Sequence, residues 1–318
     1  MNLTKGKKKI KIDISVVIPV YGCDKSLIEL YDRITVTLKK IVKTYEIIFI
    51  DDCGRGKPWE LIKKISENDS FVNGLKLSRN FGQHAAITAG LEVSKGDWVV
   101  VMDCDLQDKP EEIEKLYSAL QGGADIVLAQ RINRRDPIYK KIFSWFFYRL
   151  LGYLTSTKID ASIANFGIYS RKVIDAVLSM GESHKYFPIM VRWVGFNAIS
   201  IPVSHGNRVN DNTTYSFRKL VSLSFGIIMS FSDKPLRLIV KYGFILSFLS
   251  AVYAVFIVID AFIYEASVPG WSSMIFSLWF IGGMLMGIMG VVGLYVGKTF
   301  DESKSRPVYI IDEIIKPI

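Results

Sequence analysis

Residues 98–105 read WVVVMDCD, an uninterrupted apolar run that ends in two aspartates. Residues 46–52 (EIIFIDD) and 15–20 (SVVIPV) have the same character, and Leu75–Leu77 and Ile126–Ala129 are shorter runs of the same kind. Continuous runs rich in β-branched residues are typical of strands that are buried on both faces. The sequence therefore predicts five buried strands.

Helical patterns lie between these runs. They cover Pro58–Asn68, Gln83–Ser94 and Pro110–Gln121, and helix-compatible sequence follows the first run as far as Val42. Two of these patterns begin with proline, which suits the first turn of a helix. Strands that alternate with helices predict an α/β fold with a doubly wound, mostly parallel sheet that is covered on both faces.

Acidic residues gather where a ligand of such a sheet would bind, beyond the carboxyl ends of the strands. Asp51 and Asp52 end one run, and Asp103 and Asp105 follow another. A hard divalent cation relieves the repulsion between two carboxylates, and Gln107 adds a neutral oxygen. We therefore predict that this second group binds Mg²⁺ or Mn²⁺ with a phosphate-bearing ligand. A plain turn with capping aspartates is the alternative.

Motifs of several other enzyme classes are missing from the sequence. None of GxGxxG, GxxxxGK[ST] or GxSxG follows an expected strand. Their absence disfavours a dinucleotide oxidoreductase, a P-loop kinase and a hydrolase with a nucleophile elbow. A metal-bound diphosphate without a P-loop indicates a nucleotide-sugar instead.

The composition is unusually apolar. The 318 residues are 50% hydrophobic and 22% charged, which excludes a disordered chain and is atypical of a soluble protein. A net charge of +9 fits nucleic acid, anionic lipid or an anionic substrate, and the charge alone does not choose among them. The basic N-terminus leads into a strand pattern, so we expect no cleaved signal peptide.

Three cysteines, Cys23, Cys53 and Cys104, stand far apart in the sequence and form no CxxC pair. An odd number at wide spacing predicts neither a disulfide framework nor a zinc site, and it fits a reducing compartment. We expect the three side chains to be small buried fillers without a catalytic role.

The excess of apolar residues is concentrated near the C-terminus. Residues 238–264 carry only two charges, and residues 271–297 carry none. Roughly 20 apolar residues are needed to cross ~30 Å of hydrocarbon, so we expect two transmembrane helices; a pair of buried core helices is the alternative. Gly283 and Gly287 form a GxxxG pair, which permits close helix packing in a homo-oligomer.

Lysine and arginine residues flank both apolar segments, whereas the short loop between them has neither. The positive-inside rule therefore places residues 1–235 and the tail 298–318 in the cytoplasm, at an inner or plasma membrane. Residues 138–154 mix aromatic and basic side chains, which favours an interfacial helix on anionic lipid over a core helix. Residues 216–231 repeat this pattern, and here the two interpretations are equally balanced.

Four motifs together resemble a known family: SVVIPVYG at 15–22, IFIDDCG at 48–54, LSRNFGQHAAITAGL at 77–91 and VVMDCDLQDKPEEI at 100–113. They are similar to family 2 glycosyltransferases of the GT-A fold. The most similar branch acts on polyprenyl phosphates and includes dolichyl-phosphate mannose synthase and the bactoprenol glucosyl and aminoarabinose transferases. The resemblance continues to GLYVGKTFDESKSRP at 293–307 and so covers nearly the whole chain.

The resemblance implies an inverting, metal-dependent transfer of one sugar from a nucleotide-sugar to undecaprenyl or another polyprenyl phosphate at the cytoplasmic leaflet. A UDP-sugar and a role in cell-envelope glycan modification follow from the bacterial members of the branch. By the same resemblance the nucleotide is bound by Pro19, Tyr21, Asp51, Asp52 and Asp103, the metal by Asp103, Asp105 and Gln107, and the catalytic set is Asp103, Asp105, Arg131 and Arg208. The two arginines suit phosphate because a guanidinium binds it bidentately.

The chain departs from the family pattern at three places. Many relatives have Asp-Phe-Arg where this chain has Asn165-Phe166-Gly167, and that aspartate has been considered a catalytic base. A phosphomonoester, with a second pKa of about 6, is already mostly ionised at neutral pH. We therefore keep the enzyme prediction and leave Asn165 outside the catalytic set. Gly22-Cys23-Asp24 and Thr213-Thr214-Tyr215 replace two other common motifs.

Three other functions are alternatives to a polyprenyl-phosphate glycosyltransferase. A processive polysaccharide synthase usually carries Gln-x-x-Arg-Trp, but Ile189 stands in the glutamine position before Arg192-Trp193. A non-catalytic nucleotide-sugar-binding membrane protein would explain the altered Asn165, yet the intact metal motif argues against it. A nucleic-acid binder is disfavoured because the basic residues cluster at the membrane flanks. The sequence does not name the sugar.

Overall fold

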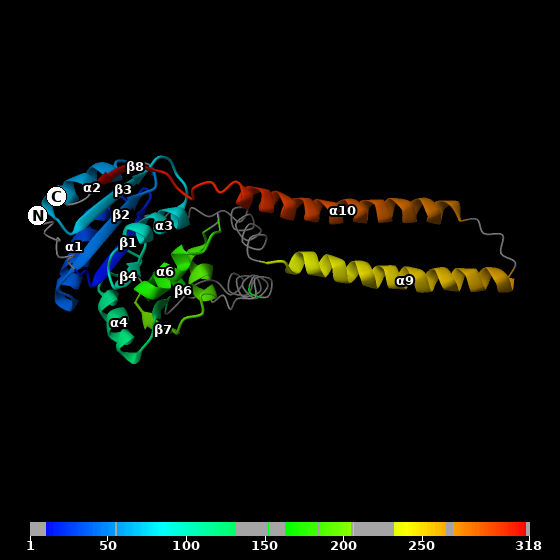
Figure 1. Ribbon diagram of the computed structural model, residues 1–318, viewed down its shortest axis with the longest axis horizontal. Coiled ribbons are helices and arrows are strands. Elements are labelled where there is room, and N and C mark those ends of the chain that lie inside the picture. Colours follow the sequence, from blue (N-terminus) through cyan, green and yellow to red (C-terminus); the bar gives the residue numbers. More distant parts are fainter. Residues whose placement is uncertain are drawn as a thin grey trace, which may run out of the picture. The chain divides into compact units, whose positions relative to one another are not determined.

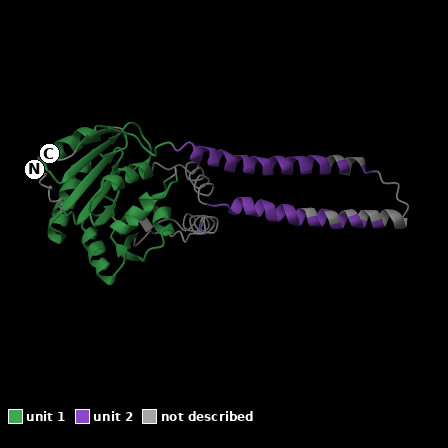
Figure 2. Ribbon diagram, viewed as in Figure 1, with its two compact units in different colours: residues 1–149, 159–214, 306–318 green, residues 150–158, 215–305 purple. Residues whose placement is uncertain are grey.

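An eight-stranded mixed sheet organises the N-terminal part of the chain (Figure 1). The computed structural model describes residues 11–54, 56–131, 152, 163–182, 185–204, 206, 232–264 and 270–315. The chain divides into two units: unit 1 comprises 1–149, 159–214 and 306–318, and unit 2 comprises 150–158 and 215–305 (Figure 2). The sheet belongs to unit 1, and the two long helices belong to unit 2.

The strands are β1 Ile14–Val20, β2 Tyr45–Asp51, β3 Val72–Leu77, β4 Trp98–Val101, β5 Ile126–Arg131, β6 Ile163–Ser170, β7 Ala198–Val203 and β8 Ile311–Ile315. The helices are α1 Leu27–Ile41, α2 Pro58–Asn68, α3 Gln83–Val93, α4 Glu112–Ala119 with the 3₁₀ turn η1 Leu120–Gly122, α6 Arg171–Leu178, α7 Phe187–Trp193, α9 Lys234–Tyr264 and α10 Trp271–Ser303. All five strands predicted from the sequence are present, and each expected helical pattern contains a helix.

The strand order is β7-β5-β6-β4-β1-β2-β3-β8. The central pairs β4–β1, β1–β2 and β2–β3 are parallel, as expected, and β5 pairs with β7 in parallel. Strand β6 is antiparallel to β4 and β5, and β8 is antiparallel to β3. The sheet is therefore mixed, with a parallel centre.

The alternating residues of β1 feed two separate cores, because successive side chains point to opposite faces of a sheet. Val16 and Ile18 pack in the cluster that contains Leu30 of α1. Val17 packs in the cluster that contains Ile87 of α3. Both faces are covered, so every residue of β1 is buried and the strand reads as one continuous apolar run.

The close approach of α3 to the sheet depends on Gly90. A Cβ at this position would lie 2.5 Å from Cγ1 of Val17 and 2.6 Å from Cδ1 of Ile50. Only a residue without a side chain allows the helix backbone to lie this near to β1 and β2. The resulting packing fixes the start of α3 beside the carboxyl ends of these strands.

The two long helices coincide with the two apolar segments of the sequence. Within the part of the chain that is described, one helical segment is long and apolar enough to cross a membrane, Ser277–Ser303 in α10. Helix α9 covers the other expected segment, but several of its side chains lie outside the described set. The expected interfacial segments 138–154 and 216–231 also lie outside the described residues, except for Gly152.

Strand β8 lies within residues 298–318, for which the sequence predicts only a cytoplasmic tail. It pairs with β3 over Gly74↔Ile315 to Leu77↔Ile311. Nζ of Lys76 lies 2.7 Å from Asp312 and 3.2 Å from Glu313, and Nε1 of Trp59 donates to Glu313. These contacts cover the edge of β3 that a seven-stranded sheet would leave unpaired.

Candidate functional site

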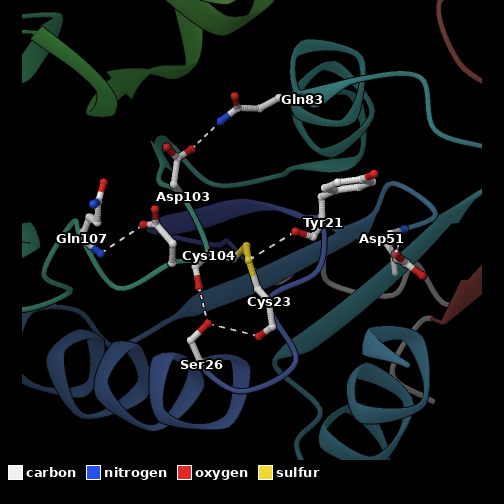
Figure 3. Close-up of a disulfide and its surroundings, with 10 residues drawn as sticks. Tyr21, Cys23, Ser26, Asp51, Gln83, Asp103, Cys104 and Gln107 are labelled. Atoms are coloured by element: carbon white, nitrogen blue, oxygen red, sulfur yellow. Dashed lines mark hydrogen bonds between the residues drawn. A yellow bond between two sulfur atoms is a disulfide. The ribbon is translucent and has the colours of Figure 1, made fainter. Parts of the chain in front are cut away.

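Three parallel strands end at the same edge of the sheet and bring their terminal residues together. Tyr21 follows β1, Asp51 ends β2, and Asp103 follows β4 (Figure 3). Because β1 lies between β2 and β4, the two acidic groups flank the loop that follows β1. The Tyr21 side chain is 52% exposed at this edge, whereas Asp51 is 4% exposed. This edge holds all the described acidic residues that the sequence predicted as ligands.

Asp51 and Asp52 differ in what their carboxylates contact. The N–H of Phe81 donates to Oδ1 of Asp52 at 2.7 Å, and the N–H of Gly82 donates to Oδ2 at 2.9 Å. For Asp51 the N–H of Gly54 lies 3.5 Å from Oδ1. Asp52 thus fixes the turn that leads into α3, whereas the carboxylate of Asp51 faces the backbone of its own turn at Cys53 and Gly54.

Burial shapes the ionisation of this acidic pair. Desolvation raises the pKa of Asp51 and of Asp52 above the usual aspartate value, and backbone N–H donors oppose that rise in both. The carboxylate of Asp52 also lies at the N-terminal end of α3, where the helix dipole favours negative charge. The backbone donors and the helix end therefore compensate part of the cost of burying two neighbouring acids.

The Asp-x-Asp motif occupies the loop after β4. Nε2 of Gln83 donates to Oδ1 of Asp103 at 2.6 Å, and the N–H of Gln107 donates to Oδ1 of Asp105 at 3.1 Å (Figure 3). Leu106 has a positive φ of 62°, which turns the chain sharply between the second aspartate and Gln107. Asp103, Asp105 and Gln107 are all partly exposed, so a ligand can reach them.

The donor set of this loop suits a cation of the magnesium type. Two carboxylates and an amide oxygen are hard ligands, and Mg²⁺ typically takes one or two carboxylates and completes its shell with ligand phosphates and water. Across the described residues no three His, Cys, Asp or Glu side chains gather as a metal site. The loop therefore fits an ion that arrives with a diphosphate better than a closed structural metal site.

Cys23 and Cys104 form a disulfide with their Cα atoms 6.1 Å apart, although 81 residues separate them in the sequence. The expectation that no cysteine pairs is therefore wrong. Strands β1 and β4 are hydrogen-bonded neighbours, so the loops that follow them leave the sheet side by side. Spacing along the chain carries no information on this proximity, which depends on the strand order.

Cys53 is a free thiol on the surface, so the expectation of a buried filler is wrong for it as well. It lies in the turn after β2 with a φ of 54°. The next residue, Gly54, packs on the loop after β1, because a Cβ there would lie 2.6 Å from the backbone N of Gly22. The three cysteines thus follow the three strands whose ends form the site.

His84 and Arg79, near α3, contact aromatic side chains. Burial lowers the pKa of His84 to about 4, so the ring is neutral at physiological pH. Its Nδ1 is shielded from solvent, and the ring packs against Tyr186 at an interplanar angle of 59°, with the ring centroids 4.4 Å apart. The guanidinium of Arg79 is exposed and lies over the ring of Phe81 at 4.2 Å. Gln83 is the residue that sequence reasoning missed; only its place at the start of α3 within RNFGQ could have suggested it.

The remaining candidates are placed by the backbone or lie outside the described residues. Arg131 is the last residue of β5, opposite Val203 of β7, and its side chain lies outside the described set. Arg208 lies outside the described residues altogether. On β6 the register Val101↔Gly167 puts Asn165 two residues beyond the last pair, toward the edge where Asp103 follows β4. Pro19 is buried within β1.

Comparisons with known proteins agree with this geometry. A family model described as "Glycosyl transferase family 2" matches residues 15–178. A Bacillus subtilis protein named "Uncharacterized glycosyltransferase YkcC" is 32% identical over 303 residues, which is 95% of this chain and 94% of that protein. An undecaprenyl-phosphate 4-deoxy-4-formamido-L-arabinose transferase of Salmonella choleraesuis is 33% identical over 315 residues, with 96% and 94% covered.

Among solved structures, glucosyl-3-phosphoglycerate synthase from Mycobacterium tuberculosis, in complex with Mn²⁺, UDP-glucose and phosphoglyceric acid, superposes with a TM-score of 0.51. The match covers 69% of this chain and 78% of that chain at 17% identity. At this identity the likeness shows a shared fold and nothing more specific.

Proposed function

The chain belongs to glycosyl transferase family 2, and on that premise we propose that this glycosyltransferase moves one sugar from a nucleotide-sugar to a polyprenyl phosphate. The observation that carries the proposal is the Asp-x-Asp loop at the carboxyl end of β4, beside the buried acidic pair that ends β2. A nucleoside diphosphate needs a cation at its phosphates and acceptors for its ribose and base. This edge of the sheet supplies both kinds of group.

The acceptor is inferred from the relatives. The Salmonella protein, one-third identical over nearly the full length of both chains, is named for transfer to undecaprenyl phosphate. An apolar segment long enough for a membrane, Ser277–Ser303, follows the catalytic unit in the same chain. A lipid-linked acceptor would explain why one chain carries both a transferase domain and an apolar helix of this length. The acceptor's tail would remain in the bilayer while its phosphate reaches the site.

In the proposed reaction, a phosphate oxygen of the lipid attacks the anomeric carbon from the face opposite the leaving nucleoside diphosphate. The C–O bond to the diphosphate breaks as the new bond forms, so the configuration inverts. The acceptor phosphate is mostly ionised at neutral pH and needs no strong base, which is consistent with asparagine at position 165. Arg131 and Arg208 are assigned to phosphate binding by their family positions, because arginine holds phosphate bidentately.

Asp103, Asp105 and Gln107 would hold Mg²⁺ or Mn²⁺ in this proposal. When bound, the cation neutralises the negative charge that develops on the leaving diphosphate. The protein's own contribution is to fix the loop: Gln83 holds Asp103, and the N–H of Gln107 holds Asp105. Tyr21 and Asp51 would contact the nucleoside, and Asp52 would support them by fixing the adjoining turn.

We propose that α9 and α10 cross the membrane once each and that unit 1, which contains the proposed active site, lies on the cytoplasmic side. Residues 159–214 and residues 306–318 belong to the same unit, so the segment between them must cross an even number of times. The lysine and arginine residues at both flanks favour the cytoplasm. A membrane-impermeant maleimide should label the exposed Cys53 in inverted vesicles and spare it in intact spheroplasts; the reverse pattern would contradict this topology.

The test of function uses full-length protein in detergent with Mg²⁺ or Mn²⁺, undecaprenyl phosphate and a panel of UDP- and GDP-sugars. Mass spectrometry of the lipid fraction should find one single-sugar adduct with one donor, and EDTA should abolish it. Asp105→Ala should also abolish it. The matched control is Asp97→Ala, which removes a carboxylate at the opposite end of β4 whose ion pair with Lys11 is exposed and of little energetic weight.

Absence of an adduct with every donor, in the presence of metal, would reject the lipid acceptor. An adduct that persists in Asp105→Ala would reject the assigned metal site. Mn²⁺ and UDP-glucose are natural first probes, since both occur in the M. tuberculosis complex of the same fold.

A further inference from the structure

We propose that the Cys23–Cys104 disulfide is a redox modification site, opened by a dithiol reductant, and that its dithiol form is the one that binds metal and nucleotide well. This inference rests on the proposed function, because it assigns a regulation to the same site. It concerns the described loops after β1, β2 and β4, where all three cysteines of the chain lie.

The position of the disulfide is the first argument. Cys104 stands between Asp103 and Asp105, so its side chain is anchored in the middle of the proposed metal-binding loop. Cys23 stands two residues after Tyr21, in the loop proposed to contact the nucleoside. The bond therefore ties the diphosphate end of the site directly to its nucleoside end (Figure 3).

Contacts other than the disulfide also hold the two loops together. The hydroxyl of Ser26 donates to the carbonyl oxygen of Cys104 at 2.7 Å and lies 3.1 Å from that of Cys23. The parallel pairing of β1 with β4 runs up to Val17↔Val101, just before both loops. Reduced thiols would thus remain near one another, so the bond can re-form by the reverse exchange, in which the disulfide form of the reductant accepts the two electrons.

The two cysteine residues differ in exposure. Cys104 is only 6% exposed, whereas Cys23 is partly exposed on a loop whose neighbours Tyr21 and Gly22 are exposed. Thiol–disulfide exchange requires the attacking thiolate to reach a sulfur atom. The geometry therefore directs attack to Sγ of Cys23. The carbonyl oxygen of Tyr21, 3.7 Å from this sulfur, can accept a hydrogen bond from the thiol once it is free.

A thiolate of the dithiol attacks Sγ of Cys23, the S–S bond breaks, and the electron pair leaves on Sγ of Cys104, which takes up a proton. The second thiol of the reductant then attacks the mixed disulfide, and Cys23 leaves as a thiolate that is protonated in turn. The protein disulfide is reduced to two thiols, and the dithiol is oxidised to its disulfide. On the cytoplasmic side proposed above, disulfides are typically transient or redox-sensing.

The direction of the effect follows from the present contacts of the two carboxylates. With the bond closed, Asp103 is held by Gln83, and Asp105 is held within its own turn. Cys104, the residue between them, is joined to the neighbouring loop by the disulfide, which restrains both carboxylates when they close around a cation with Gln107. Opening the bond removes that restraint, so we expect the dithiol form to bind a metal–diphosphate complex more tightly.

The first measurement counts thiols in the full-length protein in detergent. Unfolding in SDS and tagging with a heavy maleimide should give one tag per chain after mild oxidation, for Cys53, and three after treatment with dithiothreitol. Three tags after oxidation would overturn the proposal.

The second measurement titrates Mn²⁺ with UDP into each form by calorimetry. We expect the dithiol form to bind about tenfold more tightly, within the usual range of coupling between two events at one protein. Cys23→Ser and Cys104→Ser should bind like the dithiol form and ignore the reductant. Cys53→Ser, the matched control, should keep the full difference. Because wild type is compared in two states, a misfolded variant cannot decide the result.

Equal affinities in the two forms of the wild type would overturn the redox proposal and leave the proposed function standing. Loss of the difference in Cys53→Ser would also overturn it, because the effect would then depend on the third thiol. Failure of Mn²⁺–UDP to bind in either form, with Asp105→Ala indistinguishable from wild type, would overturn the proposed function and this inference together.

Discussion

Gln83 donates a 2.6 Å hydrogen bond from Nε2 to Oδ1 of Asp103, which joins the first residue of α3 to the loop after β4. The start of this helix is fixed in turn, since the carboxylate of Asp52 accepts hydrogen bonds from the backbone N–H groups of Phe81 and Gly82. Asp103 is therefore oriented by a chain of contacts that begins at the end of β2. A neutral amide holds the carboxylate without cancelling its charge, which a lysine at the same place would do.

Replacement of this amide by a carboxylate should impair the site. In Gln83→Glu two acids would face one another at hydrogen-bond distance, which raises the pKa of one of them and disfavours the ionised pair. We expect the affinity of Gln83→Glu for Mn²⁺–UDP to be about tenfold lower than that of the wild type at pH 7. Gln83→Asn keeps a neutral amide on a shorter side chain, so its affinity should lie between those of the wild type and Gln83→Glu. Calorimetry checks both. Gln121→Glu, the same charge change in the exposed turn η1, is the control and should bind normally.

Gly90 tests the packing that positions α3. Gly90→Ala would place a Cβ within 2.6 Å of both Val17 and Ile50, so the helix must shift or the core must strain. Overpacking of this kind costs about 1–3 kcal/mol, which should appear as a lower thermal midpoint and weaker Mn²⁺–UDP binding. Gly122→Ala has open space around the added methyl and should change neither quantity. Equal midpoints for the two variants would contradict the assigned role of Gly90.

The buried His84 should make the folding stability of unit 1 sensitive to acid. Burial lowers its pKa to about 4 from 6.5, so the unfolded chain takes up this proton first as the pH falls. Stability is unaffected above pH 6.5, declines below it and levels off near pH 4. At pH 5 the loss amounts to about 2 kcal/mol. Thermal melts at pH 7 and pH 5 measure it.

The control for that experiment is His84→Phe, which keeps a ring against Tyr186 and removes the titrating group. Asp51 and Asp52 also respond to pH, through pKa values that burial raises, but they do so in both proteins. The difference between wild type and variant therefore isolates His84. A wild type that loses no more stability than the variant between pH 7 and pH 5 would contradict the prediction.

Strand β8 predicts a structural role for the C-terminal segment. Deletion of residues 308–318 exposes the edge of β3 and removes the partners of Lys76 and Trp59. We expect the thermal midpoint to fall by more than about 5 °C and oligomers to appear in gel filtration, because an unpaired strand edge recruits other chains. Deletion of residues 316–318, which follow β8, is the control. An unchanged midpoint in the longer deletion would show that β3 tolerates an open edge.

Periodicity predicted the central strands well because β1 and β2 are buried over their whole length. The polar residues Ser15 and Glu46 lie near the strand starts and leave the apolar runs uninterrupted, and Pro58 marks the first turn of α2. Strand β8 was not predicted because its side chains alternate between partly buried and exposed, and because its partner β3 is more than 230 residues away in the sequence. A short strand of that kind has no pattern to distinguish it from a tail.

The sequence by itself determined the α/β class, the parallel centre of the sheet, the Asp-x-Asp loop and the family, since these depend on residue type and local spacing. Only the tertiary structure decided which residues meet. The order β4-β1-β2 brings the three cysteines to one edge and joins Cys23 to Cys104. The same order lets Asp52 accept a hydrogen bond from the turn into α3 and lets Gln83 donate one to Asp103. Contacts between residues far apart in the chain depend on strand order and helix packing, and a single sequence contains no local signal for either.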